Sequence, residues 1–207
     1  MKIIRIIVTD YQTNCYLISS LKNNTVIIDP GGDPELIIES IEKNNLVPKF
    51  IINTHGHVDH ITANNLFSEK YKIPVYIHEA EKDFLNNNHF NMTDFAGVNY
   101  EPAKDIKFIK TGDVLNLDEL EFKIFHTPGH TAGGITIQLD NQLFTGDTIF
   151  RDSVGRTDLP TGSFKVLENS IKDVIFKFPD NYIIYPGHGP DSTVIYEKEN
   201  NPFIKIT

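Results

Sequence analysis

The most informative stretch of the chain is Phe50-Ile51-Ile52-Asn53-Thr54-His55-Gly56-His57-Val58-Asp59-His60, in which an apolar run leads directly into three histidines and an aspartate. Its first residues predict a buried strand, so the histidines follow the end of that strand. Residues i and i+2 of an extended chain point to the same side, which allows His55 and His57 to bind one ion. Asp59 and His60 begin the next element and face a different direction. The spacing therefore favours two adjacent metal ions, and histidine is the side chain that most often binds them.

Four further segments follow the same pattern, in which an apolar strand ends and a residue able to bind metal stands in a loop with glycine or proline. They are Asp29-Pro30-Gly31-Gly32, His126-Thr127-Pro128-Gly129-His130, Gly146-Asp147 and Pro186-Gly187-His188-Gly189-Pro190. Functional side chains are often found on loops that a rigid sheet supports. The shared context predicts that these loops build one functional site.

Strands and helices alternate along the chain without a linker or a change of composition. The patterns predict strands over residues 3–8, 15–19, 25–29, 50–53, 75–77, 106–109, 114–117, 121–125, 135–139, 142–144 and 182–185. Helices are expected from 34 to about 44, with Asp33 as N-cap, from 60 to about 71, and from 164 to 178. Residues 86–104 are rich in asparagine and predict a loop. We therefore expect residues 1–207 to form a single α/β domain.

The composition is ordinary for a soluble globular protein. Of the 207 residues, 40% are hydrophobic and 23% are charged, and the formal net charge of −9 argues against a nucleic-acid partner. Cys15 is the single cysteine, so no intrachain disulfide can form, and its apolar neighbours predict that it is buried. No secretion signal or membrane-spanning run is evident, so we expect a cytoplasmic protein without a membrane partner.

The motif from Thr54 to His60, together with His130, Asp147 and His188, resembles the metallo-β-lactamase superfamily over nearly the whole chain. Further segments resemble the small, stand-alone glyoxalase II-like hydrolases of that superfamily. They are Gly146-Asp147-Thr148-Ile149-Phe150, Gly155-Arg156-Thr157-Asp158, Gly187-His188-Gly189-Pro190, Ser192-Thr193, Tyr196-Glu197 and Asn201-Pro202-Phe203. The resemblance implies a four-layer αβ/βα sandwich, in which two mixed sheets face inward, helices lie outside and the site lies on one edge.

The resemblance also implies a division of the ligands between two divalent ions, each with three ligands of its own and one shared. The first ion would take His55, His57 and His130, the second Asp59, His60 and His188, and Asp147 would bridge both. A ligand set of nitrogen and oxygen without thiolate suits Zn²⁺ first, and also Fe or Mn.

Four residues beside these ligands have supporting roles that the sequence leaves open. Asp29 is expected to orient a ligand or its loop, or else to form the turn before Pro30. Thr54 can support its neighbour by a hydrogen bond, and His126 is expected to be structural. By the resemblance, Arg156 falls where a basic residue binds substrate; the alternative is an ion pair with Asp152 or Asp158.

Two such ions would lower the pKa of a shared water from about 15.7 toward 7, and the resulting bridging hydroxide can attack a carbonyl. A thioester suits this chemistry because its thiol, with a pKa of about 8.5, leaves as thiolate. An amide would need a proton donor; Asp59 is the candidate catalytic residue, although metal ligation keeps it ionised. We therefore predict a small-molecule thioester as substrate, namely hydroxyacylglutathione or a related thiol conjugate.

Two other activities fit the same residues. A persulfide dioxygenase with one iron resembles the chain at His55, His130, Asp147 and the segment from Gly155 to Asp158, and a lactonase would use the same hydroxide. The C-terminal segments favour the hydrolase. Full-length glyoxalase II has a C-terminal helical region that holds much of its glutathione site; with 19 residues after His188, we expect this chain to lack that region.

Overall fold

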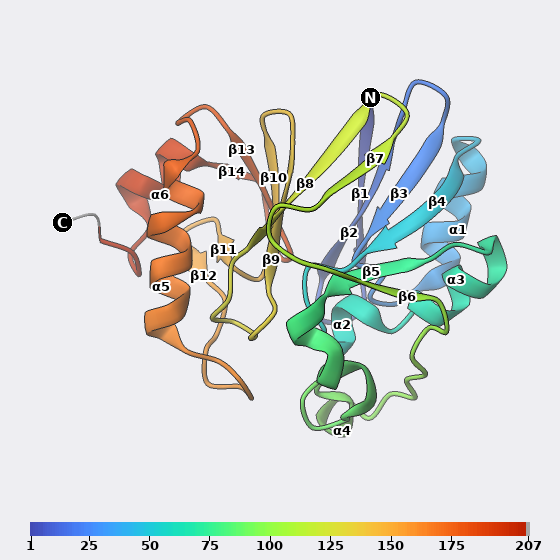
Figure 1. The fold of residues 1–207 in the computed structure, drawn as a ribbon, viewed down its shortest axis with the longest axis horizontal. Coiled ribbons are helices and arrows are strands. Elements are labelled where there is room, and N and C mark those ends of the chain that lie inside the picture. Colours follow the sequence, from blue (N-terminus) through green and yellow to red (C-terminus); the bar gives the residue numbers. More distant parts are fainter. Residues whose placement is uncertain (206–207) are drawn as a thin grey trace.

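Two six-stranded sheets form the centre of the computed structural model, which describes residues 1–205 (Figure 1). The first sheet has the order β1 (Lys2–Val8), β2 (Thr13–Ser19), β3 (Asn24–Ile28), β4 (Val47–Ile52), β5 (Val75–His78) and β6 (Ile106–Ile109). The second has the order β14 (Ser192–Thr193), β13 (Ile183–Pro186), β10 (Gln142–Gly146), β9 (Ile135–Leu139), β8 (Leu120–His126) and β7 (Val114–Leu117). Each sheet contains parallel and antiparallel pairs, as predicted.

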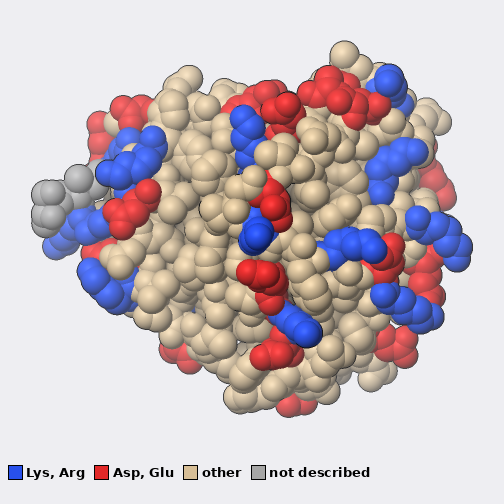
Figure 2. Space-filling view, viewed as in Figure 1, with Lys and Arg blue, Asp and Glu red and all other residues tan. Residues whose placement is uncertain are grey.

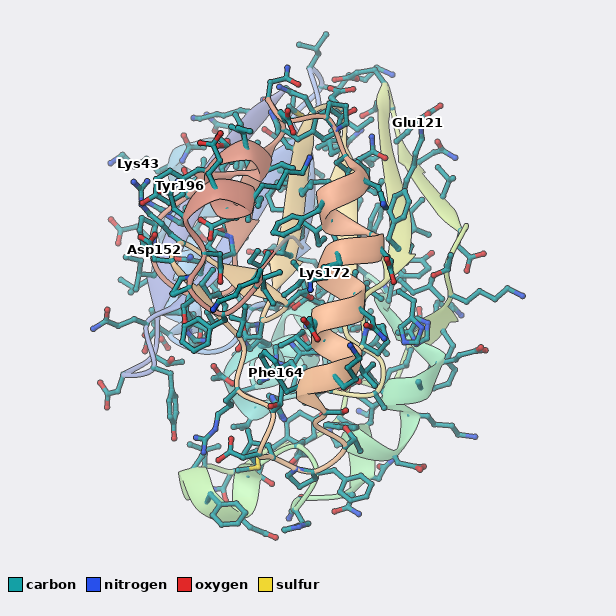
Figure 3. All side chains as sticks on the ribbon, turned by 90° about the vertical axis from the view of Figure 1, so that its left-hand side faces the viewer. Lys43, Glu121, Asp152, Phe164, Lys172 and Tyr196 are labelled. Atoms are coloured by element: carbon teal, nitrogen blue, oxygen red, sulfur yellow. The ribbon has the colours of Figure 1, made fainter. Side chains whose placement is uncertain are left out.

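Apolar side chains fill three layers of contact, one between the sheets and one outside each of them. Tyr16, Phe122 and Phe144 belong to the cluster between the sheets. The outer face of the first sheet is covered by α1 (Pro34–Lys43) and α3 (Asn64–Tyr71), and that of the second by α5 (Phe164–Asp173) and α6 (Val194–Asn200). Figure 3 looks onto α5, which begins at Phe164 and runs past Lys172. The predicted four-layer αβ/βα sandwich is confirmed.

Two predicted helix boundaries were wrong, because a tertiary hydrogen bond or a turn replaces the helical one. The helix expected from residue 60 to 71 is split into α2 (Val58–Ile61) and α3, since the amide of Ala63 donates to the Pro30 carbonyl at 3.0 Å. Asp33 is the N-cap residue of α1, as predicted, but it has a left-handed φ of 44° and its side chain accepts from the amide of Thr9 instead of an amide of α1. The helix expected over 164–178 ends at Asp173 and is followed by the 3-10 turn η2 (Ile175–Lys177).

The sequence did not predict several short elements. They are η1 (Glu79–Asn86), α4 (Thr93–Ala96), the hairpin of β11 (Ile149–Phe150) and β12 (Ser153–Val154), β14 and α6. The hairpin is bound to α6, because the Tyr196 hydroxyl donates to Asp152 Oδ1 at 3.0 Å, and both side chains are labelled in Figure 3. Glu197 of α6 is buried and accepts from the Ser192 hydroxyl and from the Asn201 amide. The C-terminal segments that carried the resemblance therefore support this hairpin.

The surface carries both signs of charge. Figure 2 shows acidic and basic side chains interspersed on the face viewed, without a broad basic area there. Among the helices of residues 1–205, none combines the length and apolar character that crossing a membrane requires.

Candidate metal centre

The residues predicted to bind metal meet at one edge of the sandwich, the lower edge in Figure 1. In the first sheet β3 and β4 are parallel, and in the second β10 and β13 are parallel, so within each pair the carboxyl ends lie together. Asp29 follows β3, and the cluster that begins at His55 follows β4. Asp147 follows β10 and His188 follows β13. The parallel pairing therefore places the loops of Asp29 and His55 side by side in the first sheet, and those of Asp147 and His188 side by side in the second.

Three overlapping groups of side chains have ligand atoms within 4.8 Å of one another. They are His55, His57 and His130; His55, His60 and Asp147; and Asp59, His60 and His188. The first and third groups have the membership that the sequence predicted for two separate ions. Asp147 lies between them, because His60 approaches its Oδ1 and His130 approaches its Oδ2.

Around Asp59, His60, Asp147 and His188, the distances between ligand atoms match those across a metal ion. Ligand atoms about 2.0–2.1 Å from a tetrahedral Zn²⁺ lie about 3.3–3.4 Å apart. His60 Nε2 is 3.5 Å from both Asp59 Oδ2 and Asp147 Oδ1. His188 Nε2 is 3.3 Å from Asp59 Oδ2 and 3.5 Å from Asp147 Oδ2. These separations exceed those of strong hydrogen bonds and leave room for a cation between the groups.

Backbone carbonyls determine which nitrogen of two histidines faces the cluster. His130 Nδ1 is 2.7 Å from the Arg156 carbonyl, and His188 Nδ1 is 3.0 Å from that of Tyr11. A carbonyl oxygen only accepts, so each Nδ1 donates its hydrogen there and Nε2 is the nitrogen left to bind a metal ion. In both histidines Nε2 lies 3.5 Å from Asp147 Oδ2.

At the first sheet, hydrogen bonds between buried side chains orient the rings of His55 and His60. The Thr54 hydroxyl donates to Asp29 Oδ2 at 2.6 Å and so accepts from His55 Nδ1 at 3.2 Å. His60 Nδ1 lies 2.9 Å from Asp29 Oδ2, and the Thr54 amide donates to Asp29 Oδ1. These contacts leave Nε2 of His55 and of His60 as the nitrogens that face the cluster. Asp29 contacts the predicted ligand His60 and Thr54 contacts its neighbour His55, and the supporting roles of both stay predictions.

The electrostatics of the cluster favour a bound cation. Burial, and then the neighbouring histidines, lower the pKa of His55 well below its ordinary value, and burial lowers that of His57 to about 3. Both rings are therefore neutral near pH 7 and can offer lone pairs. Burial opposes protonation of His60 as well, but Asp59, Asp29 and Asp147 outweigh it and raise its pKa to about 9. The carboxylates that attract a proton to His60 also attract a metal ion.

Buried polar atoms without a hydrogen-bond partner provide the test of whether these residues fit metal ions. Such atoms are uncommon and need an explanation. Within the described part of the chain they include the Nε2 atoms of His55 and His60 and Oδ1 of Asp147. All three atoms belong to the second group above, so a bound ion would satisfy each of them. The donor set and its unsatisfied atoms fit divalent metal.

The other histidines have different environments. His126 Nε2 is 2.8 Å from the Ala132 carbonyl, and its ring stacks on that of His78, so His126 is in none of the three groups. His78 Nδ1 accepts from the Ala80 amide. His89 lines the cavity described below. Cys15 is fully buried, as predicted.

Arg156 forms the ion pair that was one of its two predicted roles. Its Nε and Nη2 donate to the two carboxylate oxygens of Asp158 at 2.7 and 2.8 Å, in a bidentate arrangement at the surface. The other predicted partner, Asp152, lies instead beside Arg151 and Tyr196. Arg156 also borders the cavity above the cluster. The Arg156 backbone carbonyl therefore accepts from His130, and its guanidinium group donates to Asp158.

Glu81 is a buried residue of the site that the sequence did not predict. It lies in η1, and its carboxylate accepts from the amide of Gly56, at 2.8 Å, and from the amide of Gly133. Burial raises its pKa to about 7. In the sequence Glu81 is one of several charged residues in a polar stretch, and only the fold brings it between two loops that carry predicted ligands.

A cavity of about 1010 Å³ opens above the cluster. Its floor includes His57, Asp59, His130, Asp147 and His188, the predicted ligands. Met92 and Phe95 of the α4 region form one wall, and Leu159 and Pro160 form part of another. Arg156 is the one Lys or Arg among the lining residues, and Asp158 already pairs with it. The space suits a small molecule with an apolar part.

Comparisons with known proteins agree with this site. A model of the metallo-beta-lactamase superfamily matches residues 8–199. Hydroxyacylglutathione hydrolase GloC of Haemophilus influenzae is 36% identical over 201 residues, which cover 95% of each chain. The crystal structure of BLEG-1 B3 metallo-beta-lactamase has a TM-score of 0.93 at 35% identity and covers 98% of this chain and 99% of its own. That of TTHA1623 in a di-iron-bound form has a TM-score of 0.88 at 31% identity and covers 97% and 100%.

Proposed function

The chain belongs to the metallo-β-lactamase superfamily and is a metal-dependent hydrolase; from this premise we propose that it uses two divalent ions to hydrolyse thioesters. The observation that carries the proposal is the convergence of seven side chains from both sheets beneath one cavity. The similarity to hydroxyacylglutathione hydrolase GloC supports hydroxyacylglutathione, or a related thiol conjugate, as the substrate.

The proposed ligands follow the groups in the structure. One ion would be held by His55, His57 and His130, the other by Asp59, His60 and His188, and Asp147 would contribute to both. Nitrogen and oxygen ligands suit Zn²⁺, and also Fe or Mn. The di-iron form of TTHA1623 supports iron as the alternative to zinc.

When bound, such ions act as Lewis acids toward a carbonyl oxygen and lower the pKa of water toward 7. The protein's own residues orient the ligands and limit the access of solvent. Asp29 holds His60, and the carbonyls of Arg156 and Tyr11 hold His130 and His188. Phe95 and Leu159 place apolar surface beside the reacting centre.

The surroundings of Asp59 support a thioester rather than an amide. Asp59 Oδ2 accepts from the Thr13 hydroxyl at 2.9 Å and lies 3.3 Å from His188 Nε2. These contacts favour the ionised carboxylate, which has no proton to give to a leaving amine. A thiol with a pKa of about 8.5 can leave without one. We propose that Asp59 acts as a ligand facing the leaving group.

Metal analysis of the purified protein, combined with turnover assays, tests the proposal. We expect about two equivalents of metal per chain and hydrolysis of S-lactoylglutathione that a chelator abolishes and added Zn²⁺ restores. A β-lactam and a lactone belong in the same assay, because BLEG-1 is a metallo-beta-lactamase and a lactone needs the same attack. Turnover of the β-lactam or of the lactone without turnover of S-lactoylglutathione would contradict thioester hydrolysis.

A persulfide dioxygenase with one iron is the second candidate that the sequence raised. The separate group of Asp59, His60 and His188 favours the hydrolase, because a single ion would leave these residues without a ligand role. Oxygen consumption with a thiol persulfide, together with one iron per chain, would establish the dioxygenase instead.

A further inference from the structure

We propose that Glu81 is a positioning residue of the metal centre: its carboxylate joins the loop of His55 and His57 to the loop after His130, and so sets the spacing of the first ion's ligands. The inference depends on the metal-binding part of the proposed function and not on the identity of the substrate. No oxygen of Glu81 belongs to the three groups of ligand atoms, so it acts through the loops.

The hydrogen bonds of Glu81 connect the two sheets. Gly56 lies between His55 and His57 in the loop that follows β4 of the first sheet. Gly133 lies after His130 in the segment that leads into β9 of the second sheet. Each of these backbone amides donates to a different oxygen of the Glu81 carboxylate. One fully buried side chain therefore determines how the two segments lie relative to each other.

Both glycines are needed for this close approach. A Cβ added to Gly56 would come within 2.8 Å of Glu81 Oε2, and one added to Gly133 would come within 2.6 Å of Glu81 Cγ. These separations are shorter than real Cβ contacts. The glycine between the two histidines thus has a physical reason, since any side chain there would displace Glu81.

The carboxylate and a neighbouring ring act on the same histidine. Phe84, also in η1, packs with its ring centroid 5.8 Å from that of His57. His57 Nδ1 in turn faces His130 Nε2 at 2.9 Å, and these two nitrogens belong to the proposed ligands of the first ion. A shift of η1 or loss of a Glu81 hydrogen bond would therefore change the separation of these two nitrogens.

The direct test is titration of the metal-free protein with Co²⁺, followed by its visible absorption. Glu81→Gln has nearly the same shape, but its amide group offers one acceptor oxygen and faces one of the glycine amides with a donor. We expect its affinity for the first Co²⁺ to fall about tenfold or more and its spectrum at saturation to change. Glu79→Gln, an exposed residue of the same 3-10 helix, should keep the wild-type affinity and spectrum.

Wild-type affinity and spectrum in Glu81→Gln would overturn the proposal. Should this variant not fold, hydrogen exchange in the wild-type protein decides. The amides of Gly56 and Gly133 should exchange at least about tenfold more slowly than an amide exposed in a loop, because Glu81 holds both. Exchange at the exposed rate would refute the positioning role. Absence of thioester turnover would refute the proposed substrate while leaving the Co²⁺ result unaffected.

Discussion

The two sheets contribute to the metal centre in different ways. The first supplies four of the proposed ligands from six consecutive residues, His55 to His60, whereas the second supplies His130, Asp147 and His188 from three separate loops. His55 and His60 of the first sheet are oriented by buried side chains, whereas His130 and His188 of the second are oriented by backbone carbonyls. We call the ligands from the first sheet the first half of the centre and those from the second sheet the second half. Side-chain substitutions at supporting residues should therefore disturb the first half, whereas the backbone carbonyls that support the second half are retained in any variant.

Among the substitutions considered, removal of a metal ligand should lower thioester hydrolysis most. The loss should be larger for a ligand from the first sheet than for one from the second. His57 is buried, whereas the His188 side chain is 26% exposed. We expect His57→Ala to lower thioester hydrolysis by about 10³-fold or more and His188→Ala by about 10²-fold, because the first ion is expected to polarise the carbonyl. Steady-state hydrolysis rates of both variants, together with their metal content, measure these losses. The reverse order would contradict the assignment of the first ion, and His78→Gln serves as the control.

A supporting carboxylate of the first half should matter next. Asp29 accepts from the Thr54 amide, from the Thr54 hydroxyl and from His60 Nδ1. Asp29→Asn replaces one acceptor oxygen by a donor, and we expect metal affinity to fall about 10–100-fold. Competition with a chromophoric chelator measures this. Unchanged affinity would show that His60 does not depend on Asp29.

The equivalent change in the second half should have little effect. Arg156 orients His130 through its backbone carbonyl, which Arg156→Ala retains, so metal affinity should stay within about twofold. The side chain is already paired with Asp158 at the surface, so we expect KM for S-lactoylglutathione to change by less than about threefold. A tenfold rise in KM for this anionic substrate, without one for an uncharged thioester, would instead support the substrate-binding role.

The smallest effect is expected at the opposite edge of the sandwich, where Asp118 joins the turn before β3 to the turn before β8. Hydrogen bonds from Ser20, Asn24 and Lys22 lower the pKa of Asp118 to about 2 from its ordinary 3.8. Its stabilising contribution is therefore complete above about pH 4 and is lost as the pH falls through about 2.

Thermal unfolding of Asp118→Asn measures this contribution. We expect Tm to fall by about 2 °C or less at pH 7, and the difference from the wild-type protein to vanish near pH 2. Thioester hydrolysis should be unchanged at pH 7, since Asp118 lies far from the metal centre along both sheets. A difference in Tm that grows on acidification would contradict the lowered pKa.

The difference between the two halves also explains what the sequence could reveal. The ligand-type residues between His55 and His60 are recognisable by themselves, because their spacing is local. His130, Asp147 and His188 were identified through a resemblance and a shared strand-to-loop context. Their meeting depends on strand pairing, since Asp147 and His188 follow parallel strands and His130 lies in the loop between the antiparallel strands β8 and β9. Most strands and helices followed from periodicity, and the layered sandwich from the resemblance.

Features created by tertiary contacts were not predictable. Nothing near Glu81 in the sequence indicates that its carboxylate is buried between two glycine amides. The break between α2 and α3 depends on the Pro30 carbonyl, which is distant in sequence. The choice between the two roles of Arg156 needed the position of Asp158 relative to the guanidinium group. The extent of a single domain over residues 1–207 stays a prediction.

The central claim is that residues of both sheets hold two adjacent ions. Metal titration of wild-type protein and of Asp147→Ala, read together with hydrolysis of S-lactoylglutathione, tests it most directly. We predict that the wild-type chain binds two equivalents and is active, whereas Asp147→Ala loses one equivalent and nearly all turnover, because Asp147 lies between both groups. A wild-type chain that is fully active with one equivalent, or an active Asp147→Ala, would contradict the account.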